Sequence, residues 1–459
     1  MGLEKLKINF YGAAGTVTGS KFLIEFRERR IFIDCGLFQG LKSMRLLNWE
    51  HLNVPASSVD TVLLTHGHLD HCGYLPRLMH DGFKGRIHGT LPTLEIAEII
   101  LNDSARIHEE EAERANKYGY SKHKPAKPLY TVEDVANTIS HFKAEPLDHW
   151  INLGDEIQCR FRYNGHIIGA TFIELNIKGK RIVFSGDIGR RNDLLMRAPE
   201  QPEDADIIII ESTYGDTINS QDTTRSQLAD VVNRTVERAG SVIIPSFAVE
   251  RAQTLMYLLW MMREAGEIPK VEVYLDSPMG SSVLEVFKRY RTWHKLTEAE
   301  CLEMCKDICQ LQSLESTYAV IDDYHPKIVI AGSGMITGGR VLRYLEKYLG
   351  DESTTVLLAG FQSEGTRGRE LQEGAKQIRI NGKMLDVHAE IKTIAGLSAH
   401  ADQSELLWWL EKLKKAPEKI AIVHGETTAS EALRKEISAK YGYNCIIPAM
   451  YEVLEVEIP

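Results

Sequence analysis

Residues 65–76 read THGHLDHCGYLP, a stretch with four metal-binding residue types: His66, His68, Asp70 and His71. The preceding TVLLT predicts a β-strand. Side chains two residues apart on an extended chain share a face, so His66 and His68 can reach one metal. Asp70 and His71 lie where a helical pattern begins and can turn toward a second metal. Imidazole nitrogens with carboxylate oxygens suit Zn²⁺, and Mn²⁺ or Fe²⁺ are alternatives.

These ligands are too few to complete a site for two metals, and two later residues are candidates to join them. His166 lies in RYNGHIIGA, a glycine-flanked turn between predicted strands, and Asp187 follows a strand in VFSGDIG. Either residue alone would more commonly be an ordinary surface or core residue. Because each candidate lies at the end of an apolar strand, one sheet edge can present them together, and Asp187 is suited to bridge two metals.

With Asp34 in IFIDCG, these segments resemble the four successive motifs of the metallo-β-lactamase superfamily across roughly the first 190 residues. The resemblance implies an α/β fold, the αβ/βα sandwich, with two zinc ions at its sheet edge. It implies one zinc on His66, His68 and His166, the other on Asp70 and His71, and Asp187 between them. Asp34 would orient the ligand imidazoles and the water of the site.

Three later residues narrow the family. Glu211 opens ESTYG, His400 lies in GLSAHAD and His424 lies in IVHGE; each alone could be an exposed polar residue in a turn. In this order, around a long insert and with GAAGTVTGS and AGSGMITGGR elsewhere, they resemble the motifs of the β-CASP ribonuclease branch. That branch includes the endonuclease of pre-mRNA 3′-end processing and its bacterial and archaeal relatives.

The resemblance implies a zinc-dependent ribonuclease that hydrolyses phosphodiester bonds of single-stranded RNA. His424 would complete the second zinc site, and a hydroxide bridging the two ions would attack the phosphorus. His400 would protonate the leaving 3′-oxygen with Glu211 as its partner, giving 5′-phosphate and 3′-hydroxyl ends. Asp70, Glu211 and His400 are the expected catalytic residues. Endonucleolytic cleavage is expected; 5′-exonucleolytic cleavage, DNA as substrate and manganese as the working metal stay open.

The alternation of strands and helices divides the chain into three segments. Residues 1–210 and 387–459 are expected to form the metallo-β-lactamase domain, and residues 211–386 an inserted α/β domain on a mostly parallel sheet. In the insert, KIVIAGSGMITGGRVLRYL predicts a strand, a glycine-rich loop and a helix. The N–H groups of Ser333, Gly334 and Met335, with Arg340, could bind a substrate phosphate near that helix. An ordinary turn with solvated arginines is the alternative, also for Arg343, Arg367 and Arg369.

Bulk composition limits the remaining possibilities. A net charge of −10 argues against broad, non-specific coating of nucleic acid, although a local basic surface is compatible with it. The basic stretch KYGYSKHKPAK, residues 117–127, could contact RNA or be a solvated loop. No signal peptide or membrane-length apolar run is found, so a cytoplasmic enzyme without membrane contact is expected. RNA is the expected partner, and a homodimer is a possible assembly.

Two other functions compete with the ribonuclease. A metallohydrolase of a small ester or thioester would need only the first four motifs, and would not need Glu211, His400 or the insert. A non-catalytic scaffold subunit would be expected to lack metal ligands, whereas every ligand position here is filled.

Overall fold

The computed structural model describes residues 4–119, 121–218, 223–360 and 362–458, and the chain forms two compact units. We call residues 1–218 with 400–459 the first unit and residues 219–399 the insert. None of the helices within the described residues has the length and apolar character needed to cross a bilayer.

The first sheet of the first unit has the strand order β22-β1-β2-β3-β4-β5-β6. Its strands are β1 (Glu4–Phe10), β2 (Phe22–Phe26), β3 (Arg29–Ile33), β4 (Thr61–Leu63), β5 (Arg86–Gly89), β6 (Phe142–Ala144) and β22 (Val453–Ile458). Strand β1 pairs antiparallel with β2 and β22, whereas β3, β4, β5 and β6 are parallel neighbours. The parallel half therefore directs the loops after β3, β4 and β5 to one edge.

The second sheet has the order β21-β20-β11-β10-β9-β8-β7. Its strands are β7 (Ile151–Gly154), β8 (Ile157–Tyr163), β9 (Thr171–Ile177), β10 (Lys180–Phe184), β11 (Ile207–Glu211), β20 (Lys419–Val423) and β21 (Cys445–Ile446). Strands β10, β11, β20 and β21 run parallel, so β20 joins the sheet from beyond the insert.

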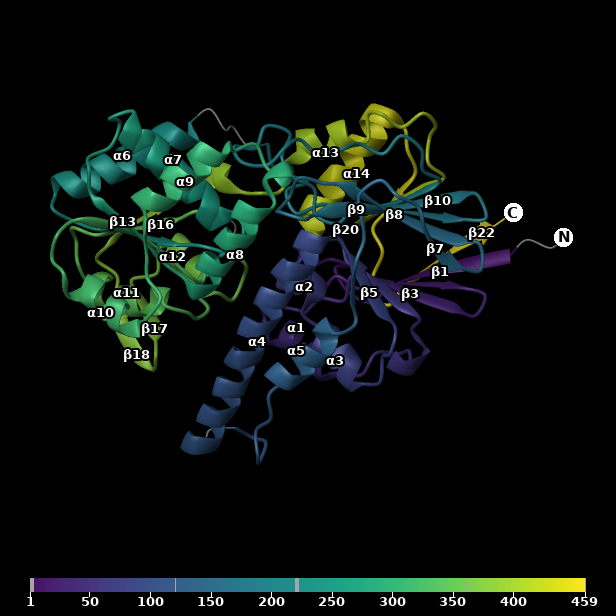
Figure 1. Ribbon diagram of the computed structural model, residues 1–459, viewed down its shortest axis with the longest axis horizontal. Helices are drawn as coiled ribbons and strands as arrows, with labels where there is room; N and C mark the ends of the chain where they lie inside the picture. The colour runs from purple at the N-terminus through teal and green to yellow at the C-terminus, as the bar shows by residue number, and fades with distance from the viewer. Residues whose placement is uncertain (1–3, 120, 219–222, 361, 459) are drawn as a thin grey trace. The chain divides into compact units, whose positions relative to one another are not determined.

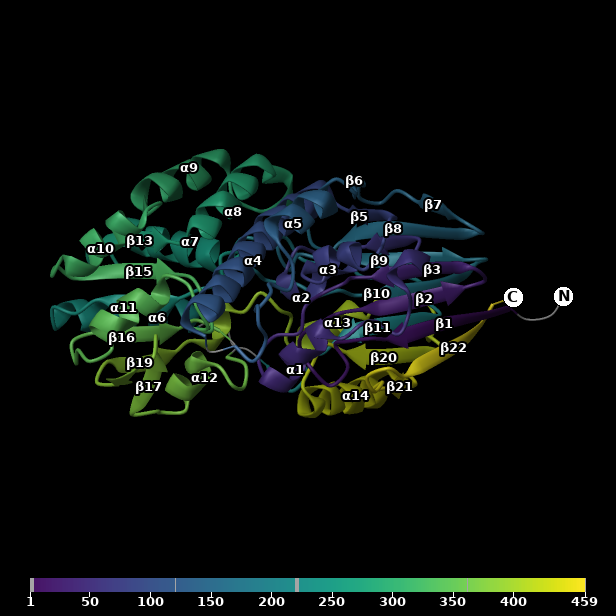
Figure 2. The same cartoon turned by 90° about the horizontal axis from the view of Figure 1, so that it is seen from below.

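The two sheets pack face to face between two layers of helices (Figure 1, Figure 2). The helices are α1 (Lys42–Leu46), α2 (Leu69–Cys72), α3 (Leu75–His80), α4 (Leu91–Tyr118) and α5 (Val132–Ile139) by the first sheet, and α13 (Gln403–Trp409) and α14 (Thr427–Tyr441) by the second. Between the sheets, buried side chains of both form one core, as where the rings of Phe22 and Phe184 lie 5.8 Å apart. The predicted αβ/βα sandwich is confirmed.

The insert is built on a six-stranded sheet, β14-β13-β15-β12-β16-β19, in which every pair is parallel. Its strands are β12 (Val242–Pro245), β13 (Glu272–Asp276), β14 (Cys309–Gln310), β15 (Lys327–Ala331), β16 (Thr355–Leu358) and β19 (Glu390–Thr393), with a separate hairpin of β17 (Gln377–Ile380) and β18 (Lys383–Asp386). Strands β12, β15 and β16 are buried along their whole length, as expected with both faces covered.

Helices cover both faces of the insert's sheet (Figure 1). They are α6 (Thr224–Glu237), α7 (Arg251–Glu264), α8 (Pro278–Arg289), α9 (Glu298–Asp307), α10 (Leu314–Asp322), α11 (Val341–Tyr348) and α12 (Arg367–Gln372). The predicted inserted domain on a mostly parallel sheet is therefore confirmed.

The insert begins and ends later in the chain than the boundaries predicted at 210/211 and 386/387. The backbone N–H of Gln403 donates to the carbonyl of Thr217 at 3.0 Å, which holds the residues after β11 in the first unit. Strand β19 pairs with β16, which holds the residues after 386 in the insert. Backbone pairing, which the strand-and-helix pattern does not reveal, sets both boundaries.

Trp409 and Trp408 provide a test of packing at the outer face of the second sheet. Trp409 is fully buried with its ring edge-on to Phe172, 5.5 Å away, whereas Trp408 is only partly buried. We expect Trp409→Ala to lower the free energy of unfolding by about 3–5 kcal/mol because it leaves a cavity. Urea unfolding measures this, and Trp408→Ala, expected to lose about 1 kcal/mol, is the matched control. Equal losses in both variants would contradict the packing described.

Candidate metal centre

The segment between β4 and α2 places its four ligand types in two directions. Strand β4 ends at Leu63, the chain bends at Thr65, His68 is extended, and α2 then begins at Leu69. The side chains of His66 and His68, before the helix, therefore point in a different direction from those of Asp70 and His71, within its first turn. His66 and His71 are buried, and His68 and Asp70 are partly buried.

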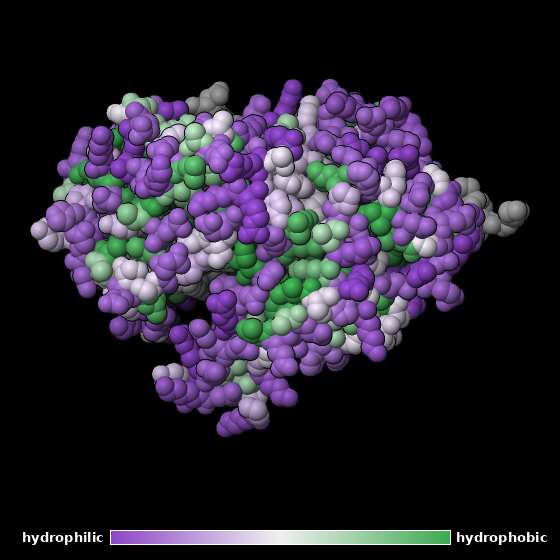
Figure 3. Space-filling model, in the orientation of Figure 1, coloured by the Kyte–Doolittle hydropathy of each residue, from purple (hydrophilic) through white to green (hydrophobic). Residues whose placement is uncertain are grey.

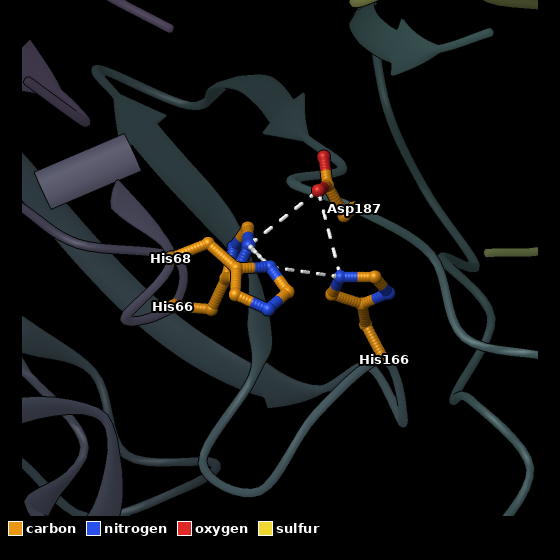
Figure 4. A group of neighbouring side chains, drawn as sticks. All are labelled: His66, His68, His166 and Asp187. Atoms are coloured by element: carbon orange, nitrogen blue, oxygen red, sulfur yellow. Dashed lines mark hydrogen bonds and ion pairs between the residues drawn. The ribbon is translucent and has the colours of Figure 1, made fainter. Parts of the chain in front are cut away.

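The first cluster consists of His66, His68, His166 and Asp187, whose ligand atoms all lie within 4.8 Å of one another (Figure 4). His68 Nδ1 is 3.1 Å from His66 Nε2 and 3.3 Å from His166 Nε2. Asp187 Oδ2 is 3.4 Å from His66 Nε2 and 3.6 Å from His166 Nε2. Ligand atoms on a tetrahedral zinc lie about 3.3–3.6 Å apart, so these spacings fit one ion.

The second cluster consists of Asp70, His71 and His424. His424 Nε2 is 3.2 Å from His71 Nε2 and 3.3 Å from Asp70 Oδ2. The other oxygen of Asp187, Oδ1, is 3.3 Å from His71 Nε2 and 3.5 Å from His424 Nδ1. Asp187 thus turns one oxygen to each cluster, the arrangement expected of a carboxylate between two cations.

Burial keeps the imidazoles of the first cluster in the neutral state that metal ligands need. It lowers the pKa of His66 to about 3 and that of His68 to about 4, so both imidazoles are neutral at neutral pH. Burial alone would raise the pKa of Asp187, but the surrounding imidazoles hold it well below its ordinary range. Among the described residues, Asp187 Oδ1 accepts no hydrogen bond although it is buried. A buried anion beside neutral nitrogens fits divalent cations such as Zn²⁺ or Mn²⁺.

Asp34 fixes the orientation of His71. Its Oδ2 lies 2.8 Å from His71 Nδ1, which leaves Nε2 turned toward the second cluster. Thr65 holds the Asp34 carboxylate in turn, through its backbone N–H at 2.8 Å and its hydroxyl at 2.7 Å. The sequence reasoning overlooked Thr65, although its position directly before HGHLDH was a usable signal.

A second hydroxyl overlooked in the sequence belongs to Thr213 in ESTYG. Its Oγ1 lies 3.1 Å from His424 Nδ1 and donates to the His424 carbonyl at 3.2 Å. Thr213 therefore contacts Nδ1 of His424, as Asp34 contacts Nδ1 of His71, while Nε2 of each ring lies beside the other.

Gly36 allows the loop after β3 to pack against the helical turn that carries Asp70 and His71. The backbone N–H of Cys35 donates to the His71 carbonyl at 2.7 Å, and Ser20 donates to the Asp70 carbonyl at 2.8 Å. A Cβ at Gly36 would lie 1.6 Å from that Asp70 oxygen, a distance that no side chain can meet. The glycine is thus required by the close approach of two backbones.

His400 and Glu211 form a pair beside the clusters. His400 Nδ1 lies 3.1 Å from Glu211 Oε2, and His400 Nε2 faces Asp187 Oδ2 at 4.0 Å. Glu211 is buried at the end of β11, where the backbone N–H groups of Ile188 and Thr213 donate to it. Burial would lower the pKa of His400, but the charge and hydrogen bond of Glu211 outweigh it and raise this pKa to about 9.

The residues predicted to bind phosphate lie in the insert, where much of their bonding capacity is already used. The Ser333 N–H donates to the Gly338 carbonyl at 3.4 Å, and a Cβ at Gly334 would lie 2.9 Å from the Phe247 backbone nitrogen. Met335, next in the loop, is partly buried and its carbonyl accepts from the Gly368 N–H at 3.2 Å.

Arg340 was predicted to bind phosphate, but its guanidinium serves the insert's own framework. It pairs with the buried Asp276 at 2.5 Å and donates to the Gln312 carbonyl at 2.8 Å. Arg367 likewise donates to the carbonyl of Arg379, and Arg369 pairs with Glu373. For Arg340 the partners lie 64 and 28 residues away in the sequence, which explains why the prediction missed them.

Comparison with known proteins agrees with this architecture. Profiles described as "Metallo-beta-lactamase superfamily", "Beta-Casp domain" and "Zn-dependent metallo-hydrolase RNA specificity domain" match residues 15–232, 252–371 and 384–448. The chain is 33% identical to Ribonuclease TTHA0252 of Thermus thermophilus over 95% of its own length and 96% of that protein. The chain belongs to the metallo-β-lactamase superfamily, in its β-CASP branch.

Two more distant comparisons support the same fold. The β-CASP chain is 29% identical to Transcription termination factor FttA of Methanocaldococcus jannaschii, over 98% of its own length and 72% of that protein. A crystal structure of an Enterococcus faecalis protein of unknown function superposes with a TM-score of 0.54 at 14% identity, covering 98% of this chain and 100% of that one. The second likeness shows the fold alone.

The division of Asp187 between the clusters predicts how metal content depends on each ligand. We expect His166→Ala to weaken one metal site and Asp187→Asn to weaken both, each by about tenfold or more. Inductively coupled plasma mass spectrometry after dialysis measures metal per chain. His51→Ala changes an exposed histidine away from the clusters and serves as control. Equal metal content in the His166 and Asp187 variants would rule out the bridging arrangement.

Proposed function

We propose that this protein is a zinc-dependent ribonuclease that hydrolyses phosphodiester bonds of single-stranded RNA. The observation that carries the proposal is the His400–Glu211 pair, 3.1 Å apart, beside two clusters of metal-binding side chains. The similarity to a protein named as a ribonuclease and the match to an RNA specificity domain support the choice of substrate.

In the proposed site, His66, His68 and His166 would hold one zinc ion, Asp70, His71 and His424 would hold the other, and Asp187 would contact both. When bound, two such cations lower the pKa of water and neutralise charge on the phosphoryl oxygens. Asp34 and Thr213 keep the nitrogens of His71 and His424 turned toward the ions. These contacts therefore fix the orientation of the His71 and His424 side chains without any contribution from RNA.

His400 is proposed to supply the proton that the departing 3′-oxygen needs. Because Nδ1 is paired with Glu211, Nε2 is the nitrogen left to face the reacting bond. A ribose alkoxide leaves poorly, and a positioned proton donor contributes about 10²–10⁴-fold. The products would carry 5′-phosphate and 3′-hydroxyl ends, and we expect endonucleolytic cleavage.

The function is tested with purified protein and end-labelled single-stranded RNA. We expect His400→Ala to lower the cleavage rate by about 10²–10⁴-fold while metal content stays unchanged, and His68→Ala to lower both. His51→Ala, with an exposed and remote side chain, should match the wild type. Equal RNA loss in all variants would indicate a contaminating nuclease and refute the proposal.

The same experiment separates the remaining alternatives. Mapping product ends on RNA with a 5′-phosphate or a 5′-hydroxyl distinguishes internal cleavage from digestion at the 5′ end. A hydrolase of a small ester or thioester would turn over such esters without needing His400, and would leave the RNA intact.

A further inference from the structure

The C-terminal end of α4 and the segment after it form a basic arm, which we define as residues 114–128. Its cationic side chains are Arg114, Lys117, Lys122, Lys124 and Lys127, and His123 lies among them. No aspartate or glutamate occurs between Glu113 and Glu133, although the whole chain carries a net charge of −10. The arm is thus a positively charged segment that follows directly on the acidic residues Glu109, Glu110, Glu111 and Glu113 of the same helix.

The cations of the arm are exposed and form no close ion pair among the described residues. The five lysine and arginine side chains are all exposed, and in the part of the chain that the structure describes none of them forms an ion pair. Elsewhere in the first unit such pairs are common, as between Lys178 and Glu4 at 2.6 Å or Lys414 and Glu203 at 2.7 Å. Unpaired cations are available to an external polyanion.

The arm is folded rather than a loose loop. The side chain of Asn116 donates to the Ala126 carbonyl at 2.9 Å and accepts from the Ala126 N–H at 2.7 Å, so the segment turns back on the helix. Tyr130 is then buried, with its hydroxyl 2.7 Å from that of Ser104. In the first unit the arm projects beyond the other helices and its visible face is hydrophilic (Figure 1, Figure 3).

The other end of α4 is packed directly on the loops that carry the metal-binding histidines. The hydroxyls of Thr90 and Thr93 donate to the Gly169 carbonyl at 2.7 and 2.6 Å, close to His166 in the chain. A Cβ at Gly67, between His66 and His68, would lie 2.7 Å from Ile96 Cγ2. Since α4 has 28 residues, its far end lies about 40 Å from the metal centre.

We propose that the basic arm binds the backbone of the RNA strand whose scissile bond lies at the metal centre. The inference rests on the proposed ribonuclease function and adds a distant anchor to it. About 40 Å of a stacked strand corresponds to roughly a dozen nucleotides. Lysines bind phosphates without reading sequence, and Tyr118, 68% exposed beside Lys117, can stack on a base. The arm would therefore favour long RNA over short RNA.

RNA fits the arm better than an anionic membrane does. A membrane-bound helix inserts an apolar face, whereas the described side chains of the arm offer only alanine, proline and one tyrosine beside their polar groups. Helix α4 also connects the arm to the loops that carry the metal-binding histidines. That connection would matter for a polymer that reaches both places, but not for a lipid surface.

The test compares two variants of equal charge change, both in a His400→Ala background that slows cleavage. The arm variant combines Lys117→Gln, Lys122→Gln, Lys124→Gln and Lys127→Gln. The control combines Lys84→Gln, Lys412→Gln, Lys435→Gln and Lys440→Gln, four exposed lysines elsewhere in the first unit. Fluorescence anisotropy measures binding of RNAs of about 6 and about 24 nucleotides over a range of salt concentrations.

We expect the arm variant to bind the long RNA about tenfold more weakly than the control variant and to show no such difference with the short RNA. The slope of log Kd against log salt should fall by about 2–3 for the long RNA, since four phosphate contacts are lost. Equal binding of the long RNA by both variants would overturn the proposal, as would arm-dependent binding to phosphatidylserine vesicles without arm-dependent binding to RNA.

Cleavage by the proteins with His400 intact keeps this proposal separate from the proposed function. If the wild type cleaves RNA and the arm variant binds long RNA as tightly as the control variant does, the arm proposal fails and the ribonuclease proposal stands. If the wild type cleaves no RNA but the arm still determines binding of long RNA, the ribonuclease proposal fails and only the RNA-binding role of the arm stands.

Discussion

The Asp187 carboxylate, buried between two groups of imidazoles, is the constraint on which the first unit depends. Removing a carboxylate from water costs several kcal/mol unless positive charge compensates it. Here the compensation must come from both sides, because Oδ2 faces His66 and His166 while Oδ1 faces His71 and His424. Those partners come from both sheets, so the packing of the sheets and the cohesion of the site support each other.

The backbone around Asp187 shows how little freedom the ligands retain. The loops after β3 and β4 are joined by backbone hydrogen bonds, and Gly36 is needed where they meet. On the other sheet, the ESTYG segment serves two purposes within three residues: Glu211 holds His400, and Thr213 holds His424. The orientations of His424 and His400 are thereby both fixed by a single turn of chain.

The fold and the positions of the candidate ligands could be predicted because both have local signals. Apolar strands followed by histidine or aspartate indicate ligands at a sheet edge, and the structure brings His66, His166 and Asp187 together there. Helix α5 begins with another local signal, a capping box formed by Thr131 and Asp134.

What could not be predicted depends on partners far away in the sequence. Arg340 resembles a free cation next to a glycine-rich loop, yet its carboxylate partner, Asp276, is 64 residues earlier. The boundaries of the insert lie later than expected because Gln403 bonds Thr217 and β19 pairs with β16, both contacts between residues distant in sequence. Thr65 and Thr213 were overlooked because a hydroxyl gains its role only when a ligand nitrogen lies beside it.

The place of β20 in the second sheet has a consequence for the protein during its own synthesis. His424 follows this strand and lies 211 residues after Thr213, its hydrogen-bonding partner. At the usual pace of a ribosome, that stretch takes roughly 10–40 seconds to make. A nascent chain thus carries an incomplete metal centre throughout that interval. An RNA-cutting enzyme assembled in this order lacks a complete metal centre until His424 has been added to the chain.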